Sequence, residues 1–398
     1  MRILIINTDY PSFLKDLYAR HPDLAHDSYA TQMSVRNDSL FGVFDAYSRG
    51  FRANGHEAIE VHANNGLMQR QWMREVGEPE PRGARKLSRL VSLAQRVGRR
   101  MGLGTIVPNH SLRSPFDVEP WNVADMLVAQ VKAYKPDVIL NQSVSEVGSE
   151  LLQGLRPFTQ LIVGQIASPL PEIETYGAYD LMVSSLPNFV DFYQSIGVKA
   201  QLNRLGFDPR TLELLGKPAR DVDVSFVGSI SPAHPDRAAL LERLAVETPI
   251  QVWGNGVETL PENSSVRGRY RGEAWGRNMF NVLARSRITV NKHIGIAEQY
   301  ANNMRLYEAT GMGALLITDR QVNLADMFEP GKEVVCYSDA KECVELIDYY
   351  SRNEAQRAQI AAAGQARTLK DHSYLIRTSE LAVAFQRLLS ENQHYARA

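Results

Sequence analysis

A polar helical segment stands immediately before an apolar strand in the second half of the sequence. The stretch NNMRLYEATGMGALLITD, residues 302–319, begins with helix-forming residues and then passes through Gly311 and Gly313 into an apolar run. Packing against a sheet does not require the polar side chains that this helix carries, which are Asn302, Asn303, Arg305 and Glu308. They indicate that the helix meets a polar ligand.

The start of this helix has the chemistry of an anion site. If residues 302–305 form the first turn, their N–H groups are unpaired and the helix dipole is positive there. The guanidinium of Arg305 suits phosphate, and Glu308 follows one turn later on the same side, where a carboxylate suits the paired hydroxyls of a ribose. The alternative is an ordinary surface ion pair between Arg305 and Glu308.

Other groups are expected at the same sheet edge. Lys292 ends a predicted strand over 288–293, and we expect it to reach the same cleft, although a solvated lysine is the alternative. Gly228 and Ser229 end the strand predicted over 222–229, where glycine lets the backbone approach an anion. We also assign Arg237, in the helix predicted over 236–247, to this ligand site.

One further turn is a weaker signal. In WGNG, Gly254 and Asn255 form a tight turn that leaves backbone groups free for a flat base, but an ordinary turn explains it equally well. The sequence contains no Walker P-loop and no complete G-x-G-x-x-G after its first strand. ATPase and standard NAD-dependent functions therefore lose support.

The first half of the chain carries a second group of candidate catalytic residues. Residues 8–39 are predicted to form a long polar loop that carries Asp9, His26 and Asp27. Each of these is a candidate general base. The alternative is that they only keep the loop solvated.

Alternating strands and helices must position these residues. In the first half, strands are predicted over 2–8, 58–64, 138–143, 160–168 and 180–185, with helices over 40–57 and 123–137. In the second half, strands over 222–229, 250–254, 288–293, 314–317 and 333–337 alternate with helices over 236–247 and 274–286. This order predicts an α/β protein with parallel sheets.

A chain of 398 residues is long enough for two domains. We predict a Rossmann-like domain over 1–205, a Gly- and Pro-rich linker over 206–221, and a second Rossmann-like domain over 222–398. The C-terminal helices are expected to pack back on the first domain. Two such domains face each other across a ligand-binding cleft.

One basic segment interrupts this order. Residues 67–113 hold ten Arg or Lys against three Glu, within a helical insertion predicted over about 67–115. An amphipathic helix over 85–100 either packs on its domain or meets an anionic membrane surface as a peripheral contact.

Composition excludes several function classes. The net charge of −1 gives no field that attracts nucleic acid, and two cysteines favour a reducing compartment. The N-terminal residues read as a buried strand rather than a signal peptide, and no run is long enough to span a membrane. We expect a cytoplasmic protein.

The sequence resembles GT-B glycosyltransferases, specifically the CgeB-like group of spore-maturation and surface-glycan transferases. The resemblance lies in residues 179–209, VSFVGSISPAHPDRAALLERL (224–244), the Trp-Gly pair before Arg277, and the stretch 302–319. It implies a nucleotide-sugar donor in the C-terminal domain, with Glu308 on the ribose and Arg305, Lys292 and the 228–229 loop near the diphosphate. The same resemblance implies that residues 1–205 form the acceptor domain and residues 222–398 the nucleotide-sugar-binding domain, and that the acceptor is a glycan, a lipid-linked sugar or a protein. Asp9, His26 or Asp27 would then be the general base of an inverting transfer.

One departure from related retaining enzymes is clear. Many related retaining transferases have two glutamates separated by seven residues. Counting back eight residues from Glu308 gives Tyr300, and Glu298 is out of register, so the stereochemical outcome is open. The D-x-D string at 221–223 precedes a strand and reads as linker, and no histidine ligand set is present, so neither a metal nor a cofactor is expected.

A sugar-nucleotide epimerase and a non-catalytic nucleotide-sugar-binding protein are the alternatives to a transferase.

Overall fold

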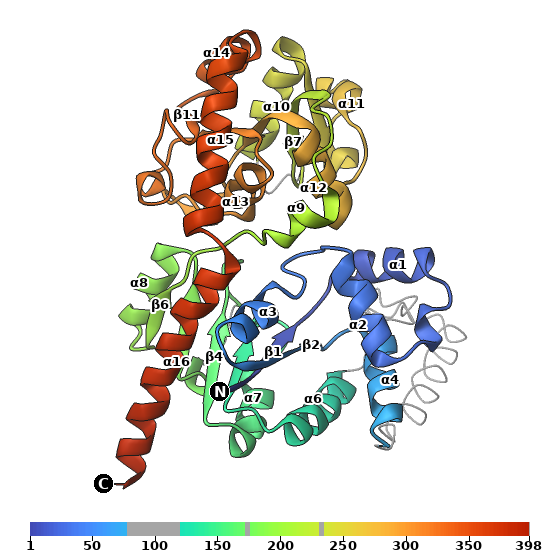
Figure 1. The fold of residues 1–398 in the computed structure, drawn as a ribbon, viewed down its shortest axis with the longest axis vertical. Helices are drawn as coiled ribbons and strands as arrows, with labels where there is room; N and C mark the ends of the chain where they lie inside the picture. The colour runs from blue at the N-terminus through green and yellow to red at the C-terminus, as the bar shows by residue number, and fades with distance from the viewer. Residues whose placement is uncertain (78–119, 172–175, 231–234, 398) are drawn as a thin grey trace, which may run out of the picture.

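The computed structural model describes residues 1–77, 120–171, 176–230 and 235–397. In this part of the chain two parallel β-sheets form, one in each half of the sequence, and the two halves are stacked along the long axis of the molecule (Figure 1). The predicted α/β fold with two Rossmann-like units is therefore confirmed.

The first sheet has six strands in the order β2-β1-β3-β4-β5-β6. The strands are β1 (Arg2–Asn7), β2 (Glu57–His62), β3 (Val138–Asn141), β4 (Leu161–Gln165), β5 (Leu181–Ser184) and β6 (Ala200–Leu202). Along β1, Ile3 and Ile5 pack into one apolar cluster, whereas Leu4 and Ile6 pack into another. Alternate side chains of a strand point to opposite faces, so both faces of this sheet are buried.

Helices and short 3₁₀ turns cover this sheet. They are α1 (Pro11–Arg20), η1 (Leu24–His26), α2 (Tyr29–Asp38), α3 (Ala46–Ala53), α4 (Gly66–Glu75), α6 (Pro120–Tyr134), α7 (Ser149–Leu155), η2 (Arg156–Phe158), η3 (Tyr176–Ala178) and α8 (Pro187–Ser195). Helix α6 occupies the position of the helix predicted over 123–137.

The prediction of a long loop over residues 8–39 is wrong, because α1, η1 and α2 occupy most of it. Pro11 stands in the first turn of α1, and the Ser28 side chain caps α2 by accepting a hydrogen bond from the Thr31 N–H. Helix α1 buries Phe13 and Leu14 on one side only. The polar residues between its apolar positions hid the helical period.

The second sheet has five strands in the order β11-β10-β9-β7-β8. They are β7 (Val222–Val227), β8 (Ile250–Trp253), β9 (Ser286–Asn291), β10 (Leu315–Asp319) and β11 (Val335–Tyr337). The helices of this half are α9 (Arg210–Leu215), α10 (Pro235–Glu247), α11 (Ser265–Arg269), α12 (Gly276–Arg285), α13 (Met304–Gly311), α14 (Ala340–Arg352), α15 (Glu354–Asp371) and α16 (Tyr374–Arg397), and its 3₁₀ turns are η4 (Val257–Thr259), η5 (Gly295–Ala297) and η6 (Leu324–Asp326).

Several predicted boundaries are displaced. The helix predicted over 40–57 is confined to α3, because Leu40 and Phe44 have positive φ angles of 58° and 37°. Within the supposed linker string 221–223, Asp223 already lies in β7 and pairs with Arg287. Helix α9 stands inside the predicted linker over 206–221.

The chain crosses between the halves at two adjacent points. The Phe207 N–H donates to the carbonyl oxygen of His372 at 2.8 Å, and the Tyr374 N–H donates to the carbonyl oxygen of Phe207 at 3.2 Å. Beyond the second crossing, α16 runs down the first half and packs on α3 (Figure 1). There the side chain of Asn54 donates to the carbonyl oxygen of Leu375 at 2.9 Å.

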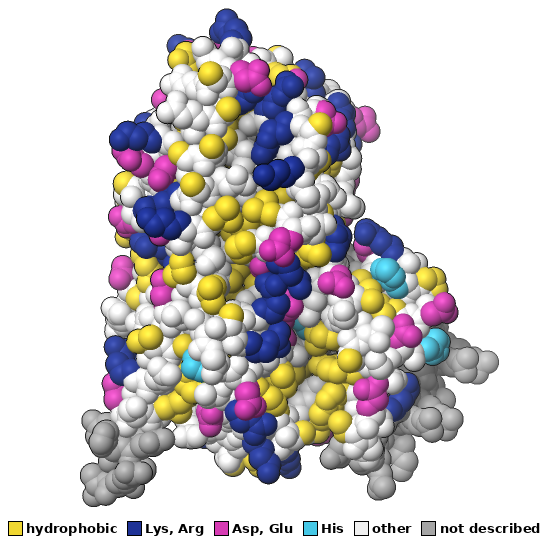
Figure 2. Space-filling view, viewed as in Figure 1, with side chains coloured by type: hydrophobic (Ala, Val, Ile, Leu, Met, Phe, Trp, Pro, Cys, Tyr) yellow, Lys and Arg dark blue, Asp and Glu magenta, His cyan; other side chains and the backbone are white. Residues whose placement is uncertain are grey.

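The predicted basic helix over 85–100 lies outside the described residues, and α4 is the described start of the segment 67–115. Among the helices that are described, none is long and apolar enough to cross a membrane. Acidic and basic side chains are interspersed over the face of the molecule shown in Figure 2, which agrees with the net charge of −1.

Candidate active site

A cavity of about 550 Å³ lies between the two halves, where the carboxyl ends of the strands of both sheets converge. From the first half it is lined by Asn7, Thr8, Asp9, Tyr10, Arg36, Phe41, Gly42 and Val43. From the second half it is lined by Phe226, Val227, Gly228, Ser229, Arg237, Trp275, Gly276, Met279, Asn291, Lys292, Asn303, Met304, Arg305 and Glu308. We call this cavity the cleft.

Helix α13 points its N-terminus into the cleft. The helix begins at Met304, two residues later than predicted, and Asn303 is its N-cap, whose Oδ1 accepts from the Leu306 N–H at 3.2 Å. The amide of Asn303 also donates to Oδ1 of Asn291 at 2.8 Å, which ties the helix start to the end of β9. Asn302 precedes the cap, is buried, and does not line the cleft.

Arg305 is held in place by protein groups. Its Nε donates to the carbonyl oxygen of Val227 at 3.2 Å, and its Nη1 lies 2.8 Å from Oε2 of Glu308. The surface ion pair considered from the sequence is therefore a buried pair on the cleft wall. Burial raises the pKa of Glu308, and the charge of Arg305 opposes that rise.

Lys292 and Arg237 are fixed by groups that the sequence did not single out. Nζ of Lys292 lies 3.3 Å from the carboxylate of Asp319, which also accepts from the His293 ring at 2.7 Å. Burial by itself raises the pKa of Asp319, but His293 and Lys292 hold it well below the usual range. Asp319 is therefore ionised at neutral pH and anchors Lys292.

Arg237 joins the loop that follows β7 to the end of β9. Its guanidinium donates to the carbonyl oxygens of Ser229 at 2.9 Å and Lys292 at 3.0 Å. Both of its Nη atoms thus donate to backbone carbonyl groups, whereas its buried Nε has no hydrogen-bond partner in the described part of the chain. Arg237 lines the cleft and positions the strand ends that form it.

Gly254 and Asn255 do not line the cleft. A Cβ on Gly254 would lie 1.8 Å from the carbonyl oxygen of Gly228, so glycine is required for the two turns to pack together. The carbonyl oxygen of Asn255 accepts from the Ile230 N–H at 2.8 Å, and its side chain is exposed. Both residues act on the loop that carries Gly228 rather than facing the cavity.

On the opposite wall, Asp9 is buried in a charge network. Arg36 donates to its carboxylate at 2.5 Å, and Nδ1 of His62 lies 3.1 Å away. Burial raises the pKa of Asp9, but Arg36 and His62 together hold it well below the usual range, which makes Asp9 a weak proton acceptor. The ion pair with Asp9 instead holds the side chain of Arg36 at the cleft.

The other two predicted base candidates lie elsewhere. His26 ends η1, Asp27 follows it, and both side chains are exposed and outside the cleft lining. Tyr300 and Glu298 are likewise absent from the lining, so neither supplies a second carboxylate beside Glu308.

Aromatic residues form a part of the cleft that was missed from the sequence. Rings of Tyr10 and Phe41 lie 5.6 Å apart, and those of Phe41 and Trp275 lie 5.9 Å apart. Tyr10 and Phe41 come from the first half and Trp275 from the second. The Trp-Gly pair before Arg277 was the available signal, but its partners are distant in sequence.

The two halves also touch directly beside this cluster. The Arg277 N–H donates to the carbonyl oxygen of Ser39 at 2.9 Å, and Nε of Arg277 donates to that of Asp38 at 2.7 Å. A Cβ on Gly276, whose φ is +50°, would lie 2.1 Å from the Ser39 carbonyl oxygen. Glycine therefore permits this contact.

No three His, Cys, Asp or Glu side chains are grouped to hold a metal ion in the described part of the chain. The positive groups of the cleft are Lys292, Arg305, Arg36 and Arg237, together with the start of α13. Such a set can stabilise a diphosphate by charge and hydrogen bonding.

Comparison with known proteins agrees with this geometry. Residues 237–382 match the family model described as glycosyl transferase-like. No curated protein matches the chain in sequence. The matched region begins in α10 and ends within the first half of α16. It therefore includes Lys292, Arg305 and Glu308.

Solved structures match over nearly the whole chain. Anabaena HepE, crystallised with UDP-glucose, has a TM-score of 0.57 at 12% identity, covering 97% of this chain and 100% of its own. Sucrose-phosphate synthase of Thermosynechococcus elongatus has a TM-score of 0.54 at 12% identity, covering 98% and 100%. A glycosyltransferase of Rickettsia africae has a TM-score of 0.56 at 12% identity, covering 98% of both chains.

Because these solved structures are only 12% identical to the chain, they establish its architecture and nothing more. The match to the family model concerns residues 237–382. The prediction of two Rossmann-like domains in the GT-B arrangement is confirmed, and the chain has the fold of GT-B glycosyltransferases with a glycosyl transferase-like C-terminal region.

Proposed function

We propose that this protein is a glycosyltransferase that moves a sugar from a nucleoside-diphosphate sugar to an acceptor. The observation that carries the proposal is the convergence of the α13 N-terminus, Arg305, Lys292 and Glu308 on one wall of the cleft, within the segment that matches the glycosyl transferase-like model. HepE, which shares the fold, was crystallised with UDP-glucose, so UDP-sugars are the first donors to test.

The roles follow from the chemistry of the transfer. As the bond from the sugar to the diphosphate breaks, negative charge grows on the diphosphate and positive charge on the sugar ring. Arg305, Lys292 and the free N–H groups at the start of α13 stabilise the leaving diphosphate. Glu308 accepts hydrogen bonds from the ribose hydroxyls, and Gly228 with Ser229 brings backbone close to the phosphates.

The acceptor enters from the first half, over Asn7, Thr8 and the Tyr10–Phe41 rings. It is a glycan, a lipid-linked sugar or a protein of the kind used by CgeB-like surface-glycan transferases. We further propose that the enzyme is cytoplasmic, that it contacts the membrane peripherally through residues 85–100, and that it needs neither a metal nor a cofactor.

A thermal-shift screen tests the donor site. UDP, GDP, dTDP and their common sugars are added to the full chain, and the cognate donor raises the melting temperature because it binds only the folded state. Arg305→Ala removes the shift, whereas Arg243→Ala, in an exposed pair on α10, keeps it. The absence of any shift with the wild-type protein contradicts the proposal.

A non-catalytic nucleotide-sugar-binding protein is the second candidate, because Tyr300 and Glu298 add no carboxylate to the cleft. Product analysis separates the candidates. Release of nucleoside diphosphate that depends on an acceptor supports a transferase, and a changed sugar with donor alone supports an epimerase. Binding without turnover over an acceptor panel supports the binding protein.

A further inference from the structure

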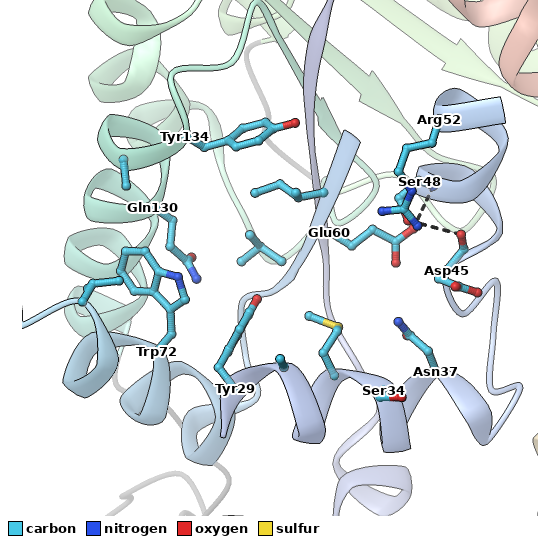
Figure 3. A pocket seen from close by; sticks show the side chains of 16 residues that line it. Tyr29, Ser34, Asn37, Asp45, Ser48, Arg52, Glu60, Trp72, Gln130 and Tyr134 are labelled. Carbon is cyan, nitrogen blue, oxygen red and sulfur yellow. Dashed lines mark hydrogen bonds between the residues drawn. The ribbon is translucent and has the colours of Figure 1, made fainter. Parts of the chain in front are cut away.

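A second cavity, of about 630 Å³, lies within the first half of the molecule and shares no lining residue with the cleft. It is enclosed by β2, which is the edge strand of its sheet, and by α2, α3, α4 and α6 (Figure 3). Helix α2 stands across from β2, and the space between them is open. We call this space the β2 cavity.

A buried carboxylate faces this cavity without a full set of partners. Glu60 is 6% exposed, and its Oε1 accepts a hydrogen bond from the Ser48 N–H at 3.1 Å. Nε2 of His62 lies 3.9 Å from its Oε2, which is too far for a hydrogen bond. Oε2 therefore has no hydrogen-bond partner among the described residues, and the side chain points into the cavity (Figure 3). A buried acceptor without a donor is costly, so a donor from a ligand would stabilise it.

A buried amide lies on the α6 side of the cavity. Gln130 is 3% exposed and donates through Nε2 to Oε1 of Gln69 at 2.7 Å, which leaves its own Oε1 without a hydrogen-bond partner in the described part of the chain. Glu60 and Gln130 thus both present acceptor oxygens from different elements. A ligand with several donor groups matches this arrangement.

Much of the remaining wall is aromatic or apolar. Tyr29 comes from α2, Trp72 from α4 and Tyr134 from α6, and the hydroxyl of Tyr29 points into the space (Figure 3). Aromatic faces of this kind pack against the apolar face of a sugar ring or an alkyl chain. The ligand must therefore have an apolar part beside its donors.

The cavity wall carries a basic as well as an acidic side chain, so neither an anion nor a cation is favoured at every contact. Arg52 lines the cavity, and Arg36, although paired with Asp9, lies close enough for its charge to lower the pKa of Glu60. The other acid of the wall, Asp45, already pairs with Arg49 and Arg210. A neutral hydroxyl meets Glu60 without repulsion from these arginines.

We infer that the β2 cavity binds a small uncharged amphipathic molecule, a sugar or polyol with an apolar substituent, whose hydroxyl groups donate hydrogen bonds to Glu60 and Gln130. The site is separate from the cleft and does not depend on the proposed transfer.

Calorimetry with n-octyl β-D-glucoside, kept below its critical micelle concentration, tests the inference on the full chain at pH 8. Saturable binding with one site per chain is expected. Octylamine and octanoate share the alkyl chain, and both are expected to bind more weakly, since the arginines repel the first and Glu60 repels the second. Tighter binding of either than of the glucoside overturns the ligand class.

Two variants locate the site. Ala133 is exposed on α6 and lines the cavity, so Ala133→Trp fills it with little cost to the fold, and Ala355→Trp on the exposed face of α15 is the matched control. The first variant is expected to abolish glucoside binding and the second to preserve it. Glu60→Gln is expected to weaken binding about tenfold, because a hydrogen bond to a charged acceptor is replaced by a neutral one.

Unfolding curves for each variant show whether a lost signal reflects a lost fold. The inference is overturned if glucoside binding is unchanged in folded Ala133→Trp and folded Glu60→Gln, or if the wild-type protein does not bind the glucoside. The donor screen of the cleft reports on a separate site, so failure here leaves the proposed transferase function standing.

Discussion

Nη1 of Arg305 lies 2.8 Å from Oε2 of Glu308 on the cleft wall, and the two side chains are 13% and 5% exposed. Removing two charges from water costs free energy that their attraction only partly returns. In the proposed transferase, a diphosphate brings anionic oxygens to Arg305 and a ribose brings hydroxyls to Glu308. The proposed function thus accounts for a pair that contributes little to stability.

Arg305→Ala is expected to weaken UDP binding by at least about tenfold and to lower the free energy of unfolding by about 3 kcal/mol, because Glu308 is left buried without its counter-charge. Glu308→Gln keeps an acceptor oxygen and is expected to have the smaller effect on stability. Calorimetry with UDP and urea unfolding measure the two quantities.

Arg243→Ala is the control for this prediction, since Arg243 pairs with Glu247 at half-exposed positions of α10. Exposed pairs of this kind contribute at most about 0.5 kcal/mol. If Arg305→Ala changes UDP binding no more than the control does, the donor site lies elsewhere.

Gly276→Ala should separate the two halves without damaging either. The new Cβ would lie 2.1 Å from the Ser39 carbonyl oxygen, and the backbone there has a positive φ. We expect UDP binding to persist, transfer to the acceptor to fall at least about tenfold because the catalytic geometry is lost, and the radius of gyration to rise in small-angle scattering.

The matched change is Gly268→Ala in α11, where a Cβ meets nothing within 4 Å. That variant is expected to behave as the wild-type protein. A Gly276→Ala protein with unchanged scattering and full activity would show that this contact does not set the domain arrangement.

Asp9→Asn distinguishes positioning from proton transfer. The carboxylate is buried against Arg36, so its loss leaves a buried arginine unpaired, and we expect a loss of about 3 kcal/mol in the free energy of unfolding. Because the pKa of Asp9 is lowered on folding, its contribution is full above the unfolded value of 3.8 and declines only as pH falls below it.

Urea unfolding of the two proteins should therefore give a constant difference from pH 5 to 8. Asp16→Asn, which removes one partner of an exposed pair with Arg20 on α1, serves as the control. A variant that keeps its stability but loses turnover completely would instead identify Asp9 as the general base.

The donor wall was largely predictable because strand ends and glycine turns carry local signals. Gly228, Lys292, Arg305 and Glu308 all follow strands or begin a helix at one sheet edge, so topology alone brings them together. Their roles remain predictions. The supporting contacts were not predictable, since Asp319 reaches Lys292 from a neighbouring strand and nothing in the local sequence pairs them.

The acceptor half was predicted less well for a physical reason. Helices α1 and α2 are mostly polar, with short buried stripes, so their period is weak. Glu60 stands within an otherwise ordinary strand, and its burial depends on α2 and α3 folding over the edge of the sheet. Contacts between distant segments decide such a site, and a single sequence does not display them.

That burial gives Glu60 a measurable effect on stability. Burial raises the pKa of Glu60 from 4.5 to about 7, although the Ser48 N–H and Arg36 oppose the rise. The folded protein then holds a proton that the unfolded chain releases, so the contribution of Glu60 is full below pH 4.5 and is lost as pH rises towards 7. A shift of this size corresponds to about 3 kcal/mol.

Urea unfolding between pH 4.5 and 7.5 tests this, with Glu60→Gln as the reference because it cannot titrate. His62 and His372 have lowered pKa values and change stability in the opposite direction. His372 is distant in sequence from Glu60 and is present in each protein, whereas Nε2 of His62 lies 3.9 Å from Oε2 of Glu60, so the comparison measures Glu60 together with its effect on His62. The wild-type protein is therefore expected to gain stability relative to Glu60→Gln as pH falls from 7.5 to 4.5. A difference independent of pH would mean that water or a bound group reaches Glu60 and keeps its pKa near the ordinary value.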